Sequence, residues 1–241
     1  MNRRHTLKSG LILIGSATLA TLLRPASAAS QILTGSRRWT AADTAPPLPV
    51  DPRLRVFFNE HEAAQIKAIF DRLIPADELS ISASEAGCVT FIDHQLAGDY
   101  GKGTARYASS PFLPGSAQQG EQGPLTPADR YRTGLAEVEK DCRARFEKSF
   151  SQLSTDDQDR YLEDLEAGRV AFSLQPSDTF FALLLANVRE GFLADPVYGG
   201  NRDMAGWKMI GFPGARYDYR DVAALKGQPL DIQPVSLIGR I

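Results

Sequence analysis

The chain has 241 residues, of which 43% are hydrophobic and 23% are charged, and its formal net charge is -2. This composition is typical of a globular protein, and the lack of a basic excess argues against a nucleic-acid partner. A chain of this length buries roughly 70% of its unfolded surface, so it needs no metal or disulfide framework to fold.

The first 28 residues are predicted to be an export signal. A pair of arginines precedes an apolar run over residues 11–23, which as a helix would span about 20 Å against a hydrocarbon core of roughly 30 Å, too short for a permanent membrane span. The residues around the pair favour a twin-arginine (Tat) signal over an ordinary Sec signal, which predicts a periplasmic protein. The motif residues are Arg3, Arg4, Leu7 and Lys8, and cleavage is expected after Ala28.

Residues 29–58 are rich in Thr, Ala and Pro and are predicted to form an extended linker that lies on a surface, its own or a partner's. A helical domain is predicted over residues 59–195. Its first helix is expected to be capped by Asn59, with Glu62 completing a capping box, and to end at Pro75.

Two further helices are predicted on either side of a long polar stretch. The second helix is expected over residues 85–96 with Ser84 as its cap. Residues 98–124 are predicted to be a loop, whose length is typical of a functional or disordered segment. The third helix is expected to start at Thr126, with Pro127 at its first helical position.

The last two predicted helices complete an all-α domain. The fourth is expected to be capped by Ser154 and stopped by Gly168. The fifth, over residues 177–194, is apolar nearly all round, which predicts a central helix or one that a partner covers. Pro196 ends it, and residues 196–241 are predicted to be an irregular tail. No segment alternates like a strand, so the expected fold is a small irregular bundle of about five helices with a long non-regular C-terminal tail.

The chain has two cysteines, Cys88 and Cys142. An even number in an exported protein favours a disulfide between them. The alternative is a pair of buried free thiols, since both residues lie on apolar faces of predicted helices.

Motifs for catalysis and cofactors are not found. Beyond the signal only two histidines occur, His61 and His94, and with two single cysteines they lack the spacing of a zinc site. There is no haem-attachment motif, four-cysteine set, dinucleotide-binding glycine motif, P-loop or nucleophile elbow. The sequence therefore predicts no catalytic, cofactor-binding or metal site on this chain.

The tail combines glycines with large apolar side chains, as protein interfaces often do. The alternative is that the tail covers the hydrophobic surface of its own domain, and both hold if different faces are used. The predicted interface residues are Tyr198, Gly199, Gly200, Asn201, Trp207, Met209, Phe212 and Pro213.

Two motifs resemble the small-subunit family of gluconate 2-dehydrogenase, also called subunit 3. The first is the Tyr-Gly-Gly-Asn segment with the following Gly-Trp and Gly-Phe-Pro-Gly elements over residues 198–214. The second combines residues 58–62 with residues 69–75. The resemblance runs from about residue 57 to the C-terminus and extends to the Tat-type leader.

The resemblance implies a small subunit without a redox centre, in a three-chain complex on the periplasmic side of the inner membrane. A large subunit with FAD would oxidise D-gluconate to 2-dehydro-D-gluconate, and a multi-haem cytochrome c would pass the electrons to quinone. The small subunit would carry the export signal for the FAD subunit and stabilise it.

Three alternatives remain open at the level of sequence. The chain could serve a related FAD-dependent dehydrogenase of glucose, fructose or sorbitol. It could be a free-standing periplasmic enzyme with residues 98–124 as a lid, which activity of the isolated chain would establish. It could also bind a small ligand, which a ligand-dependent rise in melting temperature would reveal.

Overall fold

A computed structural model describes residues 48–106, 110–113, 115–120, 122–216, 218–225, 227–228, 230 and 232–238. The predicted signal lies outside the described residues, including Arg3, Arg4, Leu7, Lys8 and Ala28. The same is true of residues 29–47 of the predicted linker, so both remain predictions. The described residues all lie in one compact unit, Pro46–Ile241.

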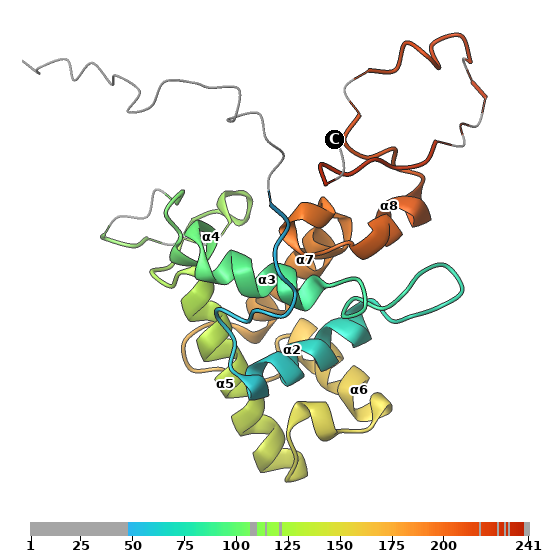
Figure 1. The fold of residues 1–241 in the computed structure, drawn as a ribbon. Helices are drawn as coiled ribbons and strands as arrows, with labels where there is room; N and C mark the ends of the chain where they lie inside the picture. Colours follow the sequence, from blue (N-terminus) through green and yellow to red (C-terminus); the bar gives the residue numbers. More distant parts are fainter. Residues whose placement is uncertain are drawn as a thin grey trace, which may run out of the picture. The chain divides into compact units, whose positions relative to one another are not determined.

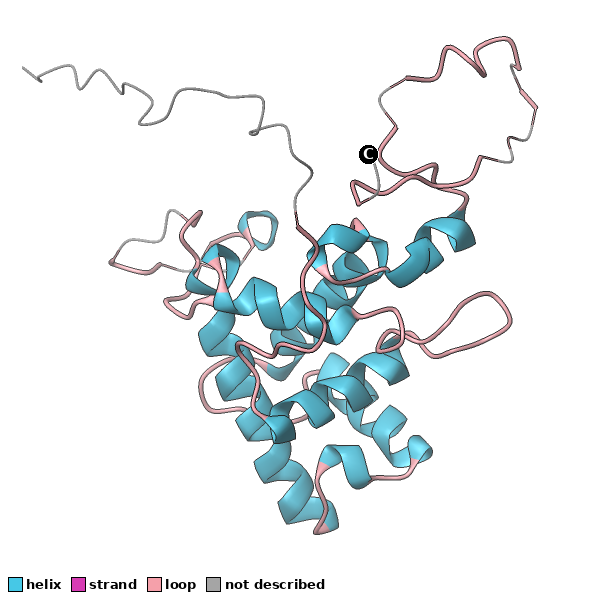
Figure 2. Cartoon of the chain, viewed as in Figure 1, coloured by secondary structure: helices cyan, strands magenta, loops and turns pink. Residues whose placement is uncertain are grey.

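The part of the chain that the structure describes contains seven α-helices and no strand, which confirms the all-α prediction (Figure 2). Short 3-10 turns and loops connect them (Figure 1). The helices are α2 (Glu60–Leu73), α3 (Cys88–Ala97), α4 (Asp99–Lys102), α5 (Pro127–Phe146), α6 (Thr155–Glu166), α7 (Ser177–Leu193) and α8 (Ala205–Ile210).

Three helices begin at the predicted caps. The Asn59 side chain accepts a hydrogen bond from the backbone of Glu62, whose carboxylate accepts one from the Asn59 backbone in return. Thr126 and Asp129 form the same reciprocal pair at the start of α5. Ser154 caps α6. Each cap satisfies backbone groups that the first turn leaves without a helical partner, and losing one costs about 1 kcal/mol.

The start of α3 differs from the prediction. The helix begins at Cys88 after the left-handed Gly87, and Ser84 does not cap it. The amide and hydroxyl of Ser84 instead donate to the carboxylate of Asp71 in α2, each at 2.8 Å. A partner 13 residues back in the chain therefore uses the side chain that the local pattern assigned to a cap.

Two segments predicted as irregular contain short helices. The predicted loop 98–124 holds α4 and a 3-10 turn, Ala117–Gln119. The predicted tail holds two 3-10 turns and α8. The turns of the tail are Pro196–Tyr198 (η4) and Arg202–Met204 (η5).

Helix α7 is central, as its apolar sequence predicts, and it packs against α2, α3, α5, α6 and α8. Phe180, Leu184 and Val188 of α7 are fully buried. Gly134 of α5 lets the Phe180 ring approach, since a Cβ there would lie 2.5 Å from the ring. Burying each such side chain contributes roughly 2 kcal/mol, so this helix carries a large share of the core.

Residues 48–58 form an extended strap that crosses α3 before the chain enters α2 (Figure 1). The buried carboxylate of Asp93 in α3 accepts backbone hydrogen bonds from Val56, Phe57 and Phe58 at 2.7, 3.1 and 2.7 Å. Further along, the amide of Val50 donates to a carbonyl of η4 at 3.2 Å. Residues 48–58 of the predicted linker are thus part of the folded domain.

Candidate partner interface

The glycine-aromatic tail has a buried half and an exposed half. Asn201, Gly206 and Trp207 are buried, whereas Tyr198 and Phe212 are about half exposed, at 50% and 44%. The buried residues therefore cover the chain's own domain, and the partner interface of the exposed residues stays a prediction.

The paired glycines of the tail allow close backbone contact. A Cβ at Gly200 would lie 2.1 Å from the carbonyl oxygen of Gly191 in α7. A Cβ at Gly87 would lie 2.3 Å from the carbonyl oxygen of Gly199. Because no side-chain atom fits in these spaces, the tail backbone rests directly on α7 and on the start of α3.

The buried half of the tail caps the end of α7. Asn201 lies in the left-handed region with φ 46°. The side-chain Nδ2 of Asn201 donates to the carbonyl of Ala194 at 2.8 Å, and its Oδ1 accepts from the backbone amide of Gly206 at 2.8 Å. The indole of Trp207 donates to the carbonyl of Leu193 at 2.7 Å. These bonds satisfy carbonyls that the helix end leaves open, so Asn201 and Trp207, predicted as interface residues, serve the chain's own fold.

Five apolar side chains of the tail and of the end of α7 are exposed, and we call this set the outer face. Phe212 packs edge-on against Trp207, with ring centroids 5.3 Å apart, so the buried half of the tail positions it. Ile210 and Leu193 belong to this face but were not predicted, although Ile210 directly follows Met209 in the motif. The outer face consists of Leu193 (41% exposed), Tyr198 (50%), Met209 (43%), Ile210 (55%) and Phe212 (44%). Gly199 and Pro213 are half-buried and Gly200 is buried.

A groove of about 570 Å³ opens beside this face, between α3, α7 and η4. Arg189 on its rim is exposed and has no ion-pair partner among the residues the structure describes. Glu190 accepts a hydrogen bond from the Asn187 amide at 2.9 Å. The lining residues are Phe91, Gln95, Arg189, Glu190, Leu193, Ala194, Asp195 and Tyr198.

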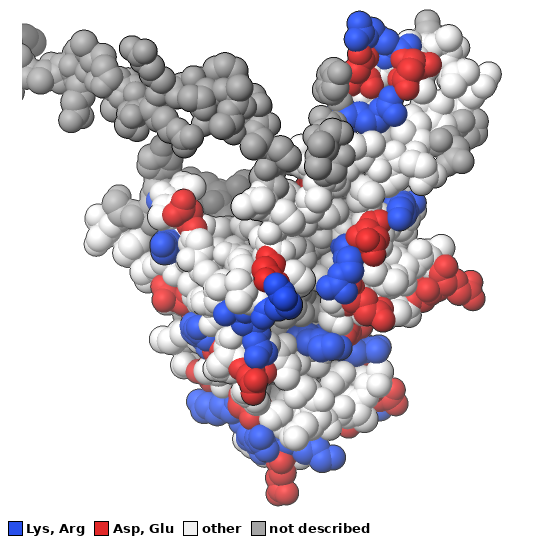
Figure 3. Space-filling view, viewed as in Figure 1, with Lys and Arg blue, Asp and Glu red and all other residues white. Residues whose placement is uncertain are grey.

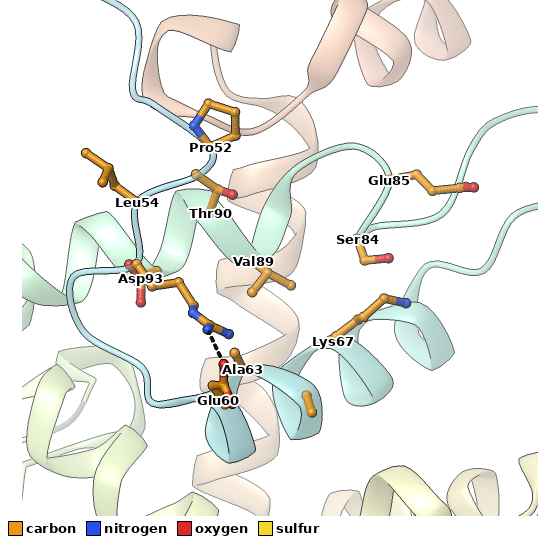
Figure 4. Close-up of a pocket in the computed structure, with 12 residues that line it drawn as sticks. Pro52, Leu54, Glu60, Ala63, Lys67, Ser84, Glu85, Val89, Thr90 and Asp93 are labelled. Carbon is orange, nitrogen blue, oxygen red and sulfur yellow. Dashed lines mark hydrogen bonds and ion pairs between the residues drawn. The ribbon is translucent and has the colours of Figure 1, made fainter.

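A second groove, of about 560 Å³, lies between the strap, α2 and α3 (Figure 4). Its charged groups have partners within the chain. Arg55 pairs with Glu60 at 3.3 Å, and Lys67 pairs with Asp71 at 2.8 Å. Asp93 is occupied by the strap amides. This groove therefore has apolar side chains between polar groups that already have hydrogen-bond or ion-pair partners. The charged side chains named here are not directed together at one point where a substrate atom could react.

A fully satisfied polar cluster lies inside the bundle. The hydroxyls of Tyr131 and Tyr100 donate to the side-chain oxygen of Asn187 at 3.0 and 3.1 Å. Burial raises the pKa of Tyr131 well above its ordinary value, so the phenol stays protonated. The cluster ties α4 and α5 to α7.

The two cysteines are free and buried, so the predicted disulfide is not present. They lie in different surroundings: Cys88 adjoins Gly191 of α7, and Cys142 adjoins Tyr161 of α6. Burial raises the pKa of each thiol to about 12. Both cysteine side chains are packed within the hydrophobic core.

The histidines and acids do not gather into a metal site within the described ranges. His61 is about half exposed and lies 3.2 Å from Glu139. The His94 ring donates to the carbonyl of Leu54 in the strap at 3.1 Å. Both histidines therefore join parts of the chain's own surface.

Cationic and anionic side chains are interspersed over the helical part, with no large area of one sign in the view of Figure 3. None of the helices in the described part is both long and apolar enough to cross a bilayer.

A family model described as gluconate 2-dehydrogenase subunit 3 matches residues 60–214, more than half of the chain. No curated protein and no solved structure matches the chain. The matched range contains the helical bundle, the groove beside α7 and the outer face of the tail.

Proposed function

Because the chain belongs to the family of gluconate 2-dehydrogenase subunit 3, we propose that it is the non-catalytic small subunit of a membrane-bound gluconate 2-dehydrogenase of the periplasm. In this complex a large subunit with FAD oxidises D-gluconate to 2-dehydro-D-gluconate. A cytochrome c subunit with haem c passes the electrons to quinone. The small subunit exports the FAD subunit on its own leader and stabilises it.

The outer face of the tail carries this proposal. Tyr198, Met209 and Phe212 are exposed, and so are the aliphatic side chains of Leu193 and Ile210. Aromatic residues and methionine are enriched in protein interfaces, and exposed apolar groups that lie together mark interaction sites. The large subunit is the partner proposed for this face.

The buried half of the tail prepares the outer face for binding. Asn201 and Trp207 fix the tail to the end of α7, and Phe212 packs on Trp207. A face held in one arrangement before association loses less conformational entropy on binding. The fold of the small subunit thus contributes to the affinity for its partner.

The leader supports the second part of the proposal. A Tat-type signal is suited to proteins that fold before export, yet this sequence contains no cofactor motif. A large subunit that loads FAD in the cytoplasm and crosses bound to this chain accounts for both features.

Assembly is tested with Met209→Ser combined with Ile210→Ser, in cells that express all subunits with an affinity tag on the large subunit. Both side chains lie on the exposed face of α8, so the fold is retained while apolar contact is lost. We expect the small subunit to be lost from the purified complex. The matched control is Leu79→Ser with Leu174→Ser, two exposed leucines outside the tail, which should co-purify normally. Equal recovery of both double variants would contradict the proposal.

Export is tested with Arg3→Lys combined with Arg4→Lys. The expected result is FAD-containing large subunit in the cytoplasm and loss of D-gluconate oxidation at the membrane. The control is the same change at Arg37 and Arg38, the other arginine pair. Normal export of the large subunit in the first variant would refute this part of the proposal. Assaying the wild-type complex with glucose, fructose and sorbitol beside gluconate distinguishes the related dehydrogenases.

A further inference from the structure

Two segments outside the family-matched range meet at one turn. The family model covers residues 60–214. From the N-terminal side, Val50 of the strap donates to the carbonyl of Val197 at 3.2 Å. From the C-terminal side, Ser236 and Leu237 bind the carboxylate of Asp195. The junction between α7 and η4 is therefore the place where two segments outside the matched range join the bundle.

Asp195 acts as a latch for the C-terminal segment. Its Oδ1 accepts from the hydroxyl of Ser236 at 2.7 Å and from the amide of Val197 at 3.0 Å. Its Oδ2 accepts from the amide of Leu237 at 2.9 Å. Hydrogen bonds to a charged acceptor are stronger than those between neutral groups. The Asp195 carboxylate thus fixes Ser236 and Leu237 to the turn between α7 and η4, which borders the groove.

The loop between residues 214 and 235 is closed at its base. The amide of Ala215 donates to the carbonyl of Val235 at 2.6 Å, and the amide of Val235 donates to the carbonyl of Pro213 at 3.3 Å. Gly214, at φ 75°, allows this contact, since a Cβ there would lie 2.3 Å from the Val235 carbonyl oxygen. Asp195 binds Ser236 and Leu237, which follow Val235, so both ends of the loop are fixed to the domain. We name this loop, residues 215–235, the arm.

The charges of the arm that the structure describes are paired within it. Arg216 binds Asp221 at 2.7 Å, and Arg220 binds Asp218 at 2.6 Å through its Nε. Figure 3 shows red and blue side chains close together on the loop that leaves the helical part. Two opposite-charge pairs give this part of the arm no net attraction for an anionic surface. Its described surface is therefore suited to apolar contact.

Such contact is available on the arm. Tyr219, Leu225 and Leu230 are each between 41% and 45% exposed. The arm is also continuous with the groove between α3 and α7, because Asp195 both lines the groove and holds the end of the arm. The unpaired Arg189 at the groove rim is suited to a carboxylate of whatever lies there.

We propose that the arm and the groove together form one docking surface for the large subunit of the complex, with Asp195 as the latch that joins them. This inference rests on the proposed function. The groove supplies an apolar lining and the unpaired Arg189. The arm supplies the exposed side chains of Tyr219, Leu225 and Leu230.

The first experiment uses Tyr219→Ser with Leu225→Ser in the complex purified through the large subunit. Both side chains are exposed and remote from the bundle core, so the variant is expected to fold. We expect at least a ten-fold faster loss of the small subunit from the complex during dilution. The matched control, Leu79→Ser with Leu174→Ser, should dissociate like the wild type.

The second experiment tests the latch with Asp195→Asn. The side-chain NH2 group introduced by the substitution would face the backbone N–H of Leu237, so two donors would oppose each other. The remaining side-chain oxygen would still accept from the backbone amide of Val197 and the hydroxyl of Ser236. We expect faster dissociation of the complex. We also expect faster trypsin cleavage at Arg220, whose side chain is 89% exposed, with cleavage at Arg169 unchanged. Ser236→Ala, which removes one of the three bonds, should have a smaller effect.

The outcomes separate this inference from the proposed function. If the wild-type small subunit does not co-purify with the large subunit, the proposed function fails. If it co-purifies and the arm variants dissociate at the wild-type rate, only the arm inference is overturned. A change in self-association of the isolated chain, with retention on the large subunit unaltered, would assign the arm to a second copy of this chain and would also overturn it.

Discussion

At the residue scale, the tail motif is explained by the carbonyls at the end of α7. The carbonyls of Leu193 and Ala194 have no partner within the helix, and Trp207 and Asn201 donate to them. Sequence reasoning identified these residues but assigned them to a partner. Composition alone does not distinguish a side chain that caps its own helix from one that binds another chain.

Replacing Asn201 with Ala should lower the free energy of unfolding by about 3 kcal/mol. Two buried hydrogen bonds are lost, and the left-handed backbone disfavours a Cβ-bearing residue without a polar side chain. Asn201→Gly loses the same bonds without the backbone strain and should be about 1 kcal/mol less destabilised. Urea unfolding measures both variants. A stability of Asn201→Ala within 0.5 kcal/mol of wild type, about the spread of neutral substitutions, would contradict this account.

Cys88 and Cys142 should not react with a thiol reagent in the folded protein. With the pKa of each thiol raised to about 12 by burial, only roughly one molecule in ten thousand is a thiolate at pH 8, and access is blocked as well. The protein should consume two equivalents of the reagent after denaturation and almost none before it. Failure to react after denaturation without reductant would show that the disulfide forms after all.

At the element scale, the predictable features were those set by neighbours in the sequence. The caps Asn59, Thr126 and Ser154 bind backbone only three residues ahead, so the local pattern is sufficient to find them. Ser84 was misassigned because its partner, Asp71, comes from another helix. Helix α8 was missed because six residues between left-handed turns are too short to show a helical period.

Gly200→Ala should separate the tail from α7. The added Cβ would lie 2.1 Å from the backbone carbonyl of Gly191, and backbone cannot rotate away as a side chain does. Overpacking of this kind costs about 1–3 kcal/mol or more. Gly98→Ala is the matched control, since its Cβ would meet its nearest neighbour at 3.5 Å, an ordinary contact. Thermal unfolding should rank Gly200→Ala well below Gly98→Ala, and equal melting temperatures would refute the close packing of the tail.

Asp71 should make the α2–α3 connection sensitive to acid. Burial raises its pKa, but hydrogen bonds from Lys67 and Ser84 together lower it further, so the net pKa lies below the ordinary 3.8. A carboxyl with a lowered folded-state pKa stabilises the fold above its unfolded pKa, and this stabilisation is lost as the pH falls through the folded value. Urea midpoints measured from pH 6 down to pH 2 should therefore fall less steeply for Asp71→Asn than for wild type. Parallel curves would show that this carboxyl contributes no acid sensitivity.

At the scale of the whole molecule, the folded unit is larger than its set of long helices. The family model starts at residue 60, yet the strap at residues 48–58 supplies three donors to the buried Asp93. The guanidinium of Arg132 in α5 also stacks 4.0 Å from the ring centre of Phe57. Sequence reasoning treated the strap as linker because proline-rich extended segments carry no periodic signal, and a carboxylate 35 residues away cannot be paired with it from pattern alone.

The strap therefore defines where the domain can be truncated. A chain that starts at Leu48, the first residue that the structure describes, is the reference. A chain that starts at Asn59 removes the three donors to Asp93 and takes Phe58 out of the core. The three hydrogen bonds to the carboxylate contribute about 1–3 kcal/mol each and the burial of Phe58 roughly 2 kcal/mol, so we expect a loss of at least about 4 kcal/mol, enough to unfold many domains of this size. Calorimetry of the two chains measures this, and a chain from Asn59 as stable as the chain from Leu48 would show that the strap only rests on the helices without stabilising them.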